Sequence, residues 1–292
     1  MSNDIKRPVI LCAGSDKRVI FAAEALTKLG RVYCFGTDGG ADGVTRLERL
    51  SDMPEKAQLL VLPVPCNTGL RIPSAAGALG CRELSEQLSE GALVTGGMMN
   101  AGLCSCFEEQ GFAVEDYFKR EELVLRNCIP TAEGALELAL RELDVTVSGL
   151  PTLVAGWGRV AKACARLFSA AGAEVSVTAR KSTALAEAVS HGHGAFPLGE
   201  LADNAGSFGL IINTVPATVL TEEVIDRTRG DCLIIDLASK PGGTDFDACS
   251  RLGRRYIHAL GLPGKCSPKT AGGIIADTVI QIFRERSGSN VT

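Results

Sequence analysis

The chain lacks the features that mark several large classes of protein. Its 292 residues contain no uninterrupted apolar stretch approaching 18 residues, so no segment is a candidate for a membrane-spanning helix. No long basic run is present and the formal net charge is -4, which argues against nucleic acid as a partner. The amino-terminal residues include no apolar segment of the kind that a secretory signal needs. We therefore expect a cytoplasmic protein.

Residue spacings typical of metal sites are also absent. His191 and His193 stand two apart in a glycine-rich segment, with no Cys, Asp or Glu beside them at ligand spacing. The chain has 11 cysteines, but Cys104 and Cys106 are the only close pair, and no C-x-x-C accompanies them. Most cysteines lie in apolar runs, where this residue acts as a small hydrophobe. We predict no metal site, and reduced cysteines in the core.

The sequence does contain a repeated alternation of apolar strands, loops and helices. Its length suits two domains, and a composition of 46% hydrophobic and 22% charged residues is typical of globular proteins. Near-continuous apolar strands between helices indicate parallel sheets covered on both faces. We predict an α/β protein with two doubly wound parallel-sheet domains, a flavodoxin-like N-terminal domain and a Rossmann NAD(P)-binding C-terminal domain. The strands expected in the first domain are 8–13, 32–35, 59–62, 92–95 and 113–116.

We place the N-terminal domain, expected to bind substrate and partner, at residues 1–129 and the Rossmann domain at residues 130–292. An Ala-, Leu- and Glu-rich helix is expected at 130–143, with 127 as an alternative start, and connects the two domains. The final helix, at 271–286, is expected to pack back on the first domain. The strands expected in the second domain are 152–156, 174–178, 209–214, 231–237 and 255–259.

The most informative motif lies at residues 153–161, where an apolar strand leads into Gly-x-Gly-x-x-Ala and a helix. Gly156 allows a sharp turn, and Gly158 lets the backbone approach a pyrophosphate held at the helix N-terminus. The flanking strands fit dinucleotide binding, and a glycine turn that binds no phosphate is the alternative. The cofactor-binding candidates in this turn are Gly156, Trp157, Gly158, Arg159 and Val160.

The next strand indicates which dinucleotide is bound. An NAD site expects an acid at the carboxyl end of this strand, but Glu174, which has about the right spacing, begins it. The carboxyl end instead carries Arg180, Lys181 and Ser182, whose cations and hydroxyl group suit a 2′-phosphate. We predict NADP, with NAD as the alternative. A solvated loop is the other interpretation of these residues.

Ligands of open α/β sheets bind outside the carboxyl ends of the strands, and this rule selects the remaining loops. We expect the loops of the two domains to face each other across a cleft. The second domain adds as cofactor-binding candidates Asn213, Thr214, Val215, Pro216, Ala238 and Ser239. The expected substrate-binding residues are Arg18, Asn67, Thr68, Gly97 and Asn100 of the first domain, together with Gly264.

These loops contain Lys, Arg, Asn and hydroxyl groups but few acids, so we expect an anionic substrate. Arg18 is a candidate for a bidentate carboxylate clamp. Lys240 and Lys265 are candidates for holding a second carboxylate or for proton transfer, and His258 is a candidate proton relay at the end of the last strand. The candidate catalytic residues are thus Lys265, Lys240 and His258. The alternatives are surface charge for the three cations and a core or helix-capping role for His258.

Two longer motifs resemble a known family. Residues 236–246 read Asp-Leu-Ala-Ser-Lys-Pro-Gly-Gly-Thr-Asp-Phe, and residues 261–272 read Gly-Leu-Pro-Gly-Lys-Cys-Ser-Pro-Lys-Thr-Ala-Gly. Both closely resemble the A subunit of dipicolinate synthase from spore-forming bacteria. Residues 212–216 and the glycine turn match in order and spacing, and residues 14–18 and 96–97 match more loosely.

The resemblance implies the dehydrogenase subunit of an enzyme in the mother-cell cytoplasm of a sporulating bacterium. That enzyme makes pyridine-2,6-dicarboxylate from a dihydro- or 4-hydroxytetrahydrodipicolinate of the lysine pathway, using NADP and a flavoprotein-like B subunit. The expected partners are the B subunit of dipicolinate synthase and a small dicarboxylate, and a homo-oligomer is also open. One alternative is another dehydrogenase, such as a 2-hydroxyacid dehydrogenase, although its late catalytic His is missing here. The other is a non-catalytic subunit that binds NADP.

Overall fold

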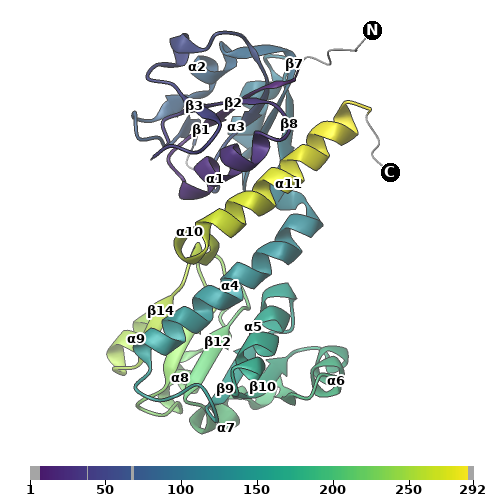
Figure 1. The fold of residues 1–292 in the computed structure, drawn as a ribbon. Helices are drawn as coiled ribbons and strands as arrows, with labels where there is room; N and C mark the ends of the chain where they lie inside the picture. Colours follow the sequence, from purple (N-terminus) through teal and green to yellow (C-terminus); the bar gives the residue numbers. More distant parts are fainter. Residues whose placement is uncertain (1–6, 38, 67–68, 289–292) are drawn as a thin grey trace. The chain divides into compact units, whose positions relative to one another are not determined.

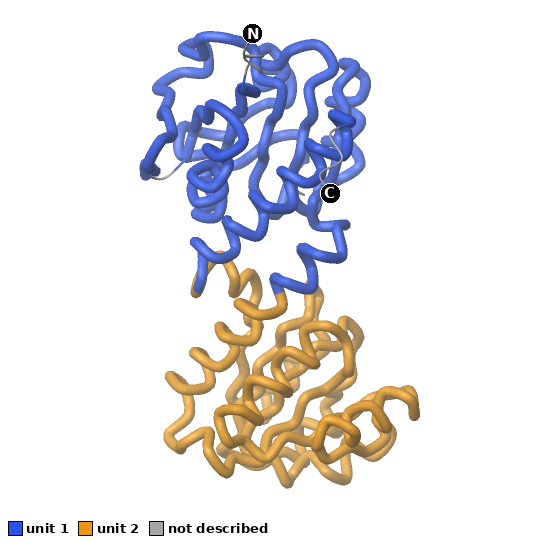
Figure 2. The backbone as a smooth tube through the Cα atoms, turned by 45° about the vertical axis from the view of Figure 1, so that its right-hand side comes forward, with its two compact units in different colours: residues 1–127, 267–292 blue, residues 128–266 orange. Residues whose placement is uncertain are grey.

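The computed structural model describes residues 7–37, 39–66 and 69–288. The chain divides into two compact units, which Figure 2 colours separately. Unit 1 takes the residues up to 127 and from 267 onward, and unit 2 takes residues 128–266. The chain therefore enters unit 2 within helix α4 (Glu121–Glu142) and returns to unit 1 just before helix α11 (Pro268–Arg286).

In the described part of unit 1, a parallel sheet has the strand order β3-β2-β1-β4-β7-β8. The five strands that the sequence predicts lie in the order β2-β1-β4-β7-β8, which is the flavodoxin-like order. The sequence missed β3, because its three residues are exposed or half-buried and show no apolar pattern. The strand bounds are β1 (Val9–Ala13), β2 (Arg31–Phe35), β3 (Val44–Arg46), β4 (Ala57–Val61), β7 (Leu88–Gly96) and β8 (Ala113–Asp116).

Helices cover both faces of this sheet. On one face, α11 packs side by side with α1, and Ile274, Ile275 and Val279 join the core that α1 forms with the strands (Figure 1). Gly272 permits this close approach, because a Cβ there would lie 2.6 Å from the Arg18 carbonyl oxygen. The other elements of unit 1 are α1 (Lys17–Leu26), α2 (Cys81–Ser85), α3 (Ala101–Glu108), the antiparallel pair β5 (Arg71–Ile72) and β6 (Leu79–Gly80), and 3-10 turns at Leu50–Asp52 and Tyr117–Lys119.

Unit 2 repeats the same topology. Its parallel sheet has the order β11-β10-β9-β12-β13-β14, so the predicted Rossmann arrangement is confirmed. The strands are β9 (Pro151–Ala155), β10 (Glu174–Ala179), β11 (Gly194–Pro197), β12 (Leu210–Asn213), β13 (Leu233–Asp236) and β14 (Arg255–His258). The helices are α5 (Arg159–Ala170), α6 (Ser182–Ser190), α7 (Leu201–Asn204), α8 (Glu222–Asp226), α9 (Phe246–Arg251) and α10 (Leu262–Cys266), with 3-10 turns at Leu198–Glu200 and Ala205–Ser207.

Three local expectations were wrong. Helix α4 begins at Glu121 rather than near 130 and continues through Pro130, because buried Leu123 and Cys128 hold the preceding turns against the protein. The segment after Gly261, expected as a loop, forms α10. The glycine-rich segment at 190–194 leads into strand β11, which the sequence did not indicate.

The cysteines also differ in one respect from the expected set of reduced thiols. Cys81 of α2 and Cys106 of α3 form a disulfide across a separation of 25 residues, and the other nine cysteines are free. Spacing along the chain could not reveal this pair, because the packing of α2 against α3 creates it. Burial raises the pKa of Cys66, Cys164 and Cys232 to about 12, so these thiols behave as core residues.

No helix among the described residues is long and apolar enough to cross a lipid bilayer.

Candidate nucleotide-binding site

The glycine turn of unit 2 joins the end of β9 to the start of α5. Gly156 has a φ of +99°, and a Cβ there would lie 2.6 Å from Oγ1 of Thr214. Its amide donates to the Thr178 carbonyl oxygen at 2.8 Å, which ties the turn to the neighbouring strand β10. Any other residue at 156 would be strained and would clash, so the first glycine is required by the turn itself.

Gly158 has a different role, because nothing in the protein requires its small size. It is the N-cap of α5, and no side chain forms a capping hydrogen bond there. A Cβ at Gly158 would meet no atom within 4 Å, so the space in front of the helix is open. The positive end of the α5 dipole therefore lies beside space that an anion can enter.

A pocket of about 300 Å³ lies at this turn, at the carboxyl ends of strands β9, β10 and β12. Thr178 is fully buried, and its hydroxyl group has no hydrogen-bond partner among the described residues. A buried hydroxyl group without a partner costs free energy. The lining residues are Gly156, Trp157, Gly158, Thr178, Ala179, Arg180, Lys181, Ala184, Leu198, Thr214, Val215 and Pro216.

The charge in this pocket is positive. Arg180 and Lys181 follow β10 directly, both are exposed, and Ser182 begins α6. No acidic residue is among the described residues that line the pocket. Glu174 is exposed at the start of β10, at the opposite end of the strand from the pocket. The described lining is therefore positively charged, as an anionic ligand would require.

Trp157 forms one side of the pocket and connects α5 to α6. Its ring lies edge-on to His191 and His193, at centroid distances of 6.1 and 5.8 Å. Lys162 lies over the same ring at 5.8 Å and forms a 2.6 Å ion pair with Glu187. Burial lowers the pKa of His193, and the charge of His191 adds to this shift. The two histidines therefore pack against the pocket wall. No group of three or more potential metal ligands occurs in the described ranges.

The remaining cofactor candidates lie on neighbouring elements. Arg159 and Val160 form the first turn of α5, while Ala238 and Ser239 follow β13. Asn213 is fully buried at the end of β12, and its amide group donates to the Asp236 carboxylate at 3.0 Å. Sequence reasoning missed Asp236 as a site residue. The available signal was a pair of polar residues, Asn213 and Asp236, at the ends of two adjacent apolar strands.

Two of the three catalytic candidates lie on adjacent strand ends. His258 ends β14, pairs in register with Asp236, and its Nε2 lies 3.1 Å from the Ala238 carbonyl oxygen. That contact requires a hydrogen on Nε2, which leaves Nδ1 as the nitrogen that can exchange a proton. The Phe246 ring stacks on the imidazole at 4.9 Å. Lys240 is exposed in the loop that follows Ala238, whereas Lys265 is exposed on α10.

The candidates of the first domain have structural partners. The Arg18 guanidinium is buried and forms a two-point ion pair with Asp16, and it also donates to the Val64 carbonyl oxygen. Asn100 caps α3 through the Leu103 amide at 2.9 Å. A Cβ on Gly97 would lie 2.5 Å from Cβ of Val64.

Three further substrate candidates complete the set. Asn67 and Thr68 lie outside the described residues. Gly264 is half-buried within α10, and its amide donates to the Gly261 carbonyl oxygen at 3.1 Å.

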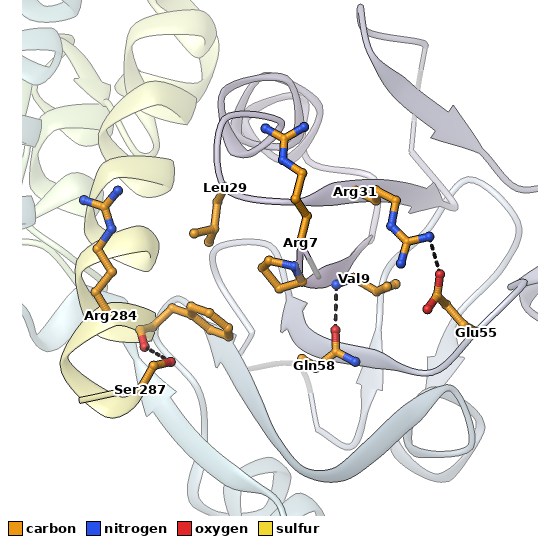
Figure 3. A pocket seen from close by; sticks show the side chains of 10 residues that line it. Arg7, Val9, Leu29, Arg31, Glu55, Gln58, Arg284 and Ser287 are labelled. Atoms are coloured by element: carbon orange, nitrogen blue, oxygen red, sulfur yellow. Dashed lines mark hydrogen bonds and ion pairs between the residues drawn. The ribbon is translucent and has the colours of Figure 1, made fainter. Parts of the chain in front are cut away.

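A larger pocket of about 730 Å³ lies in unit 1, at the amino ends of its strands (Figure 3). Arg7, Arg31 and Arg284 surround it, but each has a local explanation. Arg31 pairs with Glu55, Arg7 donates to carbonyl oxygens just after α1, and Arg284 lies in the last turn of α11. Cations at helix carboxyl ends are stabilised by the helix dipole. This edge is opposite to the one where α/β sheets bind nucleotides.

Comparison with known proteins places these features in a family. Residues 9–118 match the family model described as the N-terminal domain of the dipicolinate synthase A subunit. The chain is 31% identical over 284 residues to the dipicolinate synthase A subunit of Bacillus subtilis (strain 168), covering 94% of this chain and 96% of that protein.

Solved structures agree with this relationship. The crystal structure of the dipicolinate synthase A subunit from Bacillus halodurans has a TM-score of 0.86 at 30% identity, over 96% of this chain and 98% of that one. The Bacillus subtilis structure has a TM-score of 0.85 at 30% identity, over 98% and 99%. A transhydrogenase from Sinorhizobium meliloti shares the fold at 16% identity and a TM-score of 0.73, over 96% and 94%. The chain belongs to the family of dipicolinate synthase A subunits.

Proposed function

We propose that this chain is the NADP-dependent dehydrogenase subunit of a dipicolinate synthase. It would oxidise a dihydro- or 4-hydroxytetrahydrodipicolinate to pyridine-2,6-dicarboxylate, in the mother-cell cytoplasm of a sporulating bacterium and together with the B subunit of that enzyme. The observation that carries the proposal is the open N-terminus of α5 beside a positively charged pocket, in a chain of this family.

The residues of unit 2 fit a dinucleotide phosphate. Gly158 and the N-terminus of α5 would hold the pyrophosphate, since the N-cap residue is a glycine and supplies no side-chain cap. Arg180, Lys181 and Ser182 would hold the 2′-phosphate, because the lining offers cations and no competing acid. Thr178, whose hydroxyl group has no partner among the described residues, also lines this pocket.

The reaction removes a hydride and a proton from the dihydropyridine ring, and the 4-hydroxy substrate loses one water in addition. NADP⁺ supplies the hydride acceptor when it is bound. Aromatisation makes the oxidation strongly downhill, so the protein has mainly to orient the ring and exclude water. Lys240 and Lys265 would hold carboxylates or transfer protons. His258 could accept a proton at Nδ1, the nitrogen left free by its bond to the Ala238 carbonyl.

The cofactor assignment is tested by Arg180→Ala. Trp157 is the only tryptophan in the chain and lines the pocket, so quenching of its fluorescence measures cofactor binding directly. Loss of the charge-assisted bonds should weaken NADP⁺ about 10- to 100-fold and NAD⁺ less than about twofold. Arg166→Ala, which removes an exposed arginine of α5 outside the pocket, is the matched control. Equal weakening of both cofactors by Arg180→Ala would refute the NADP assignment.

The reaction is tested by dipicolinate formation, followed by its near-ultraviolet absorbance. The substrate is freshly made product of dihydrodipicolinate synthase with NADP⁺, supplied to this chain alone and with the B subunit added. Product from the chain alone, with an equal yield of NADPH, assigns hydride transfer to it. Product only from both chains identifies a composite enzyme. Tight NADP⁺ binding without product in either mixture would contradict the proposed reaction and favour a non-catalytic NADP-binding subunit or another dehydrogenase.

A further inference from the structure

Asp236 is a fully buried carboxylate whose hydrogen-bond partners are all donors. It ends β13 with no exposed surface. Oδ1 accepts from the Ala238 amide at 2.9 Å. Oδ2 accepts from the Gly243 amide at 2.9 Å, the Asn213 side-chain amide at 3.0 Å and the Thr244 hydroxyl group at 2.6 Å. None of these four donors is a cation, so hydrogen bonds alone must offset the cost of burying the carboxylate.

These bonds join two loops that begin at neighbouring strand ends. Asn213 ends β12, and its side chain also accepts from the Val215 amide at 3.1 Å. Gly243 lies against the same loop, because a Cβ there would be 2.1 Å from the Val215 carbonyl oxygen. The amides of Val219 and Leu220 both donate to the Gly243 carbonyl at 3.0 Å. The loops after β12 and β13 thus form one braced unit with Asp236 at its centre.

The braced unit carries candidate groups of the site on its surface. Val215 and its two neighbours line the nucleotide pocket. Lys240 is exposed on the second loop, and Ala238 accepts the hydrogen bond from His258. In a doubly wound sheet the dinucleotide spans both halves, so the β9 and β10 side takes one nucleotide and the β12 and β13 side takes the other. The glycine turn and the 2′-phosphate candidates lie on the β9 and β10 side, which leaves the braced unit to the nicotinamide half.

We propose that Asp236 is the positioning residue of the nicotinamide half of this site. Its carboxylate holds the loop that carries Lys240, together with the hydrogen bond between His258 and Ala238, against the loop that carries Thr214 and Val215. The inference rests on the proposed NADP-dependent function. A buried charge is a poor source of stability, because an apolar side chain of similar size usually serves folding as well. Its use between two ligand-facing loops is explained by geometry, since four directed bonds permit a single arrangement.

Asp236→Asn tests this directly, because neither orientation of the carboxamide satisfies the partners. If the NH₂ group takes the place of Oδ1, it faces the Ala238 amide; if it takes the place of Oδ2, it faces the amides of Gly243 and Asn213. Amide exchange of Ala238 and Gly243 in the free protein should accelerate about tenfold or more. Asp245→Asn is the matched control, because Asp245 caps α9 through one amide, which an asparagine oxygen also accepts.

Cofactor binding separates positioning from general damage. In Asp236→Asn, quenching of Trp157 should give an NADPH Kd within about threefold of wild type, since none of the four donors to Asp236 belongs to the glycine turn or to residues 180–182. The fluorescence of the reduced nicotinamide should lose its enhancement on binding, and kcat should fall about 100-fold. If Asp236→Asn fails to fold, Thr244→Val takes its place as the test. This substitution removes one of the four donors and keeps the side-chain shape, so it should give the same changes at smaller size.

The outcomes are distinct. Wild-type exchange rates at Ala238 and Gly243 in both variants would overturn the inference. Faster exchange with unchanged nicotinamide fluorescence and kcat would also overturn it, by limiting Asp236 to folding. If wild-type protein binds no NADPH, the proposed function fails and the inference fails with it, whatever the exchange rates show. Faster exchange, retained Trp157 quenching and lost nicotinamide enhancement together would support it.

Discussion

The two units share one topology but treat the same turn in opposite ways. In both, the first strand leads through a left-handed glycine into the first helix: Gly14 has a φ of +119° and Gly156 a φ of +99°. In unit 1, Asp16 then caps α1, accepting from the Arg18 amide at 2.7 Å and pairing with the Arg18 guanidinium. In unit 2, Gly158 stands at the equivalent place and supplies no cap.

The difference explains why, of these two turns, we propose the one in unit 2 as a phosphate site. The N-cap of α1 is an aspartate whose carboxylate accepts from the Arg18 amide, whereas the N-cap of α5 is a glycine with open space at its Cβ position. Strand order alone therefore does not decide whether a doubly wound sheet binds a nucleotide. We expect the deciding feature to be whether the chain fills its own helix N-terminus, and two substitutions test this in opposite directions.

The largest expected effect is on unit 1. Asp16→Ala removes the cap of α1 and leaves the buried Arg18 guanidinium with a carbonyl oxygen as its remaining described partner. We expect a loss of about 3 kcal/mol in the free energy of unfolding, with NADP⁺ affinity unchanged. Urea unfolding and Trp157 quenching measure the two quantities.

Asp245→Ala provides the control for this substitution. Asp245 caps α9 through the Ala248 amide and, among the described residues, forms no salt bridge, so its loss should cost only about 1 kcal/mol. Equal losses for Asp16→Ala and Asp245→Ala would show that Arg18 does not depend on its partner. Arg18 would then regain weight as a substrate ligand.

The next effect is on unit 2. Gly158→Val places a side chain in the open space before α5, where its Cβ has no described atom within 4 Å but the side chain would occupy the position of the proposed phosphate. Folding stability should stay within about 1 kcal/mol of wild type, because the φ of -86° suits any residue. NADP⁺ affinity should fall at least about 100-fold, or about 2.7 kcal/mol.

A matched glycine separates the two effects of Gly158→Val. Gly80 is also a helix N-cap with a φ of -85° and open space at its Cβ position, but it lies in unit 1. Gly80→Val should leave NADP⁺ binding unchanged and show the same small change in stability. Undiminished NADP⁺ binding by Gly158→Val would remove the glycine turn from the proposed site.

The sequence predicted the centre of each sheet better than its edges. Strands such as β9 and β13 are buried along nearly their whole length, so their apolar runs stand out. The missed strands β3 and β11 are both at sheet edges and are exposed or half-buried, so neither has a periodic apolar pattern. Pro130 was expected near a helix start, but tertiary packing carries α4 through it.

The geometry of the candidate site was predictable where a backbone conformation restricts the residue type. Gly156 could be found because a tight turn with a φ of +99° selects glycine, and Gly158 because the phosphate-binding motif asks for glycine two residues later. Arg18 could not be judged from its charge, since its partner Asp16 is two residues away and becomes a partner only once α1 forms. Asp236 was missed for a similar reason: its donors come from residues 213, 238, 243 and 244, which only the folded loops bring together.

The smallest expected effect sharpens the comparison at one hydroxyl group. Thr178→Val keeps the shape of a buried side chain whose hydroxyl group lacks a partner in the described protein, so the free protein should become more stable by up to about 1 kcal/mol. In unit 1, Thr95 is equally buried but donates to the Leu60 carbonyl at 3.0 Å, so Thr95→Val should cost about as much. If Thr178 serves the ligand, its substitution should weaken NADP⁺ binding severalfold while stabilising the free protein. Thermal unfolding without NADP⁺ measures the change in stability of the free protein, and the further stabilisation by NADP⁺ measures the change in binding. Destabilisation of the free protein would show that Thr178 has a structural partner instead.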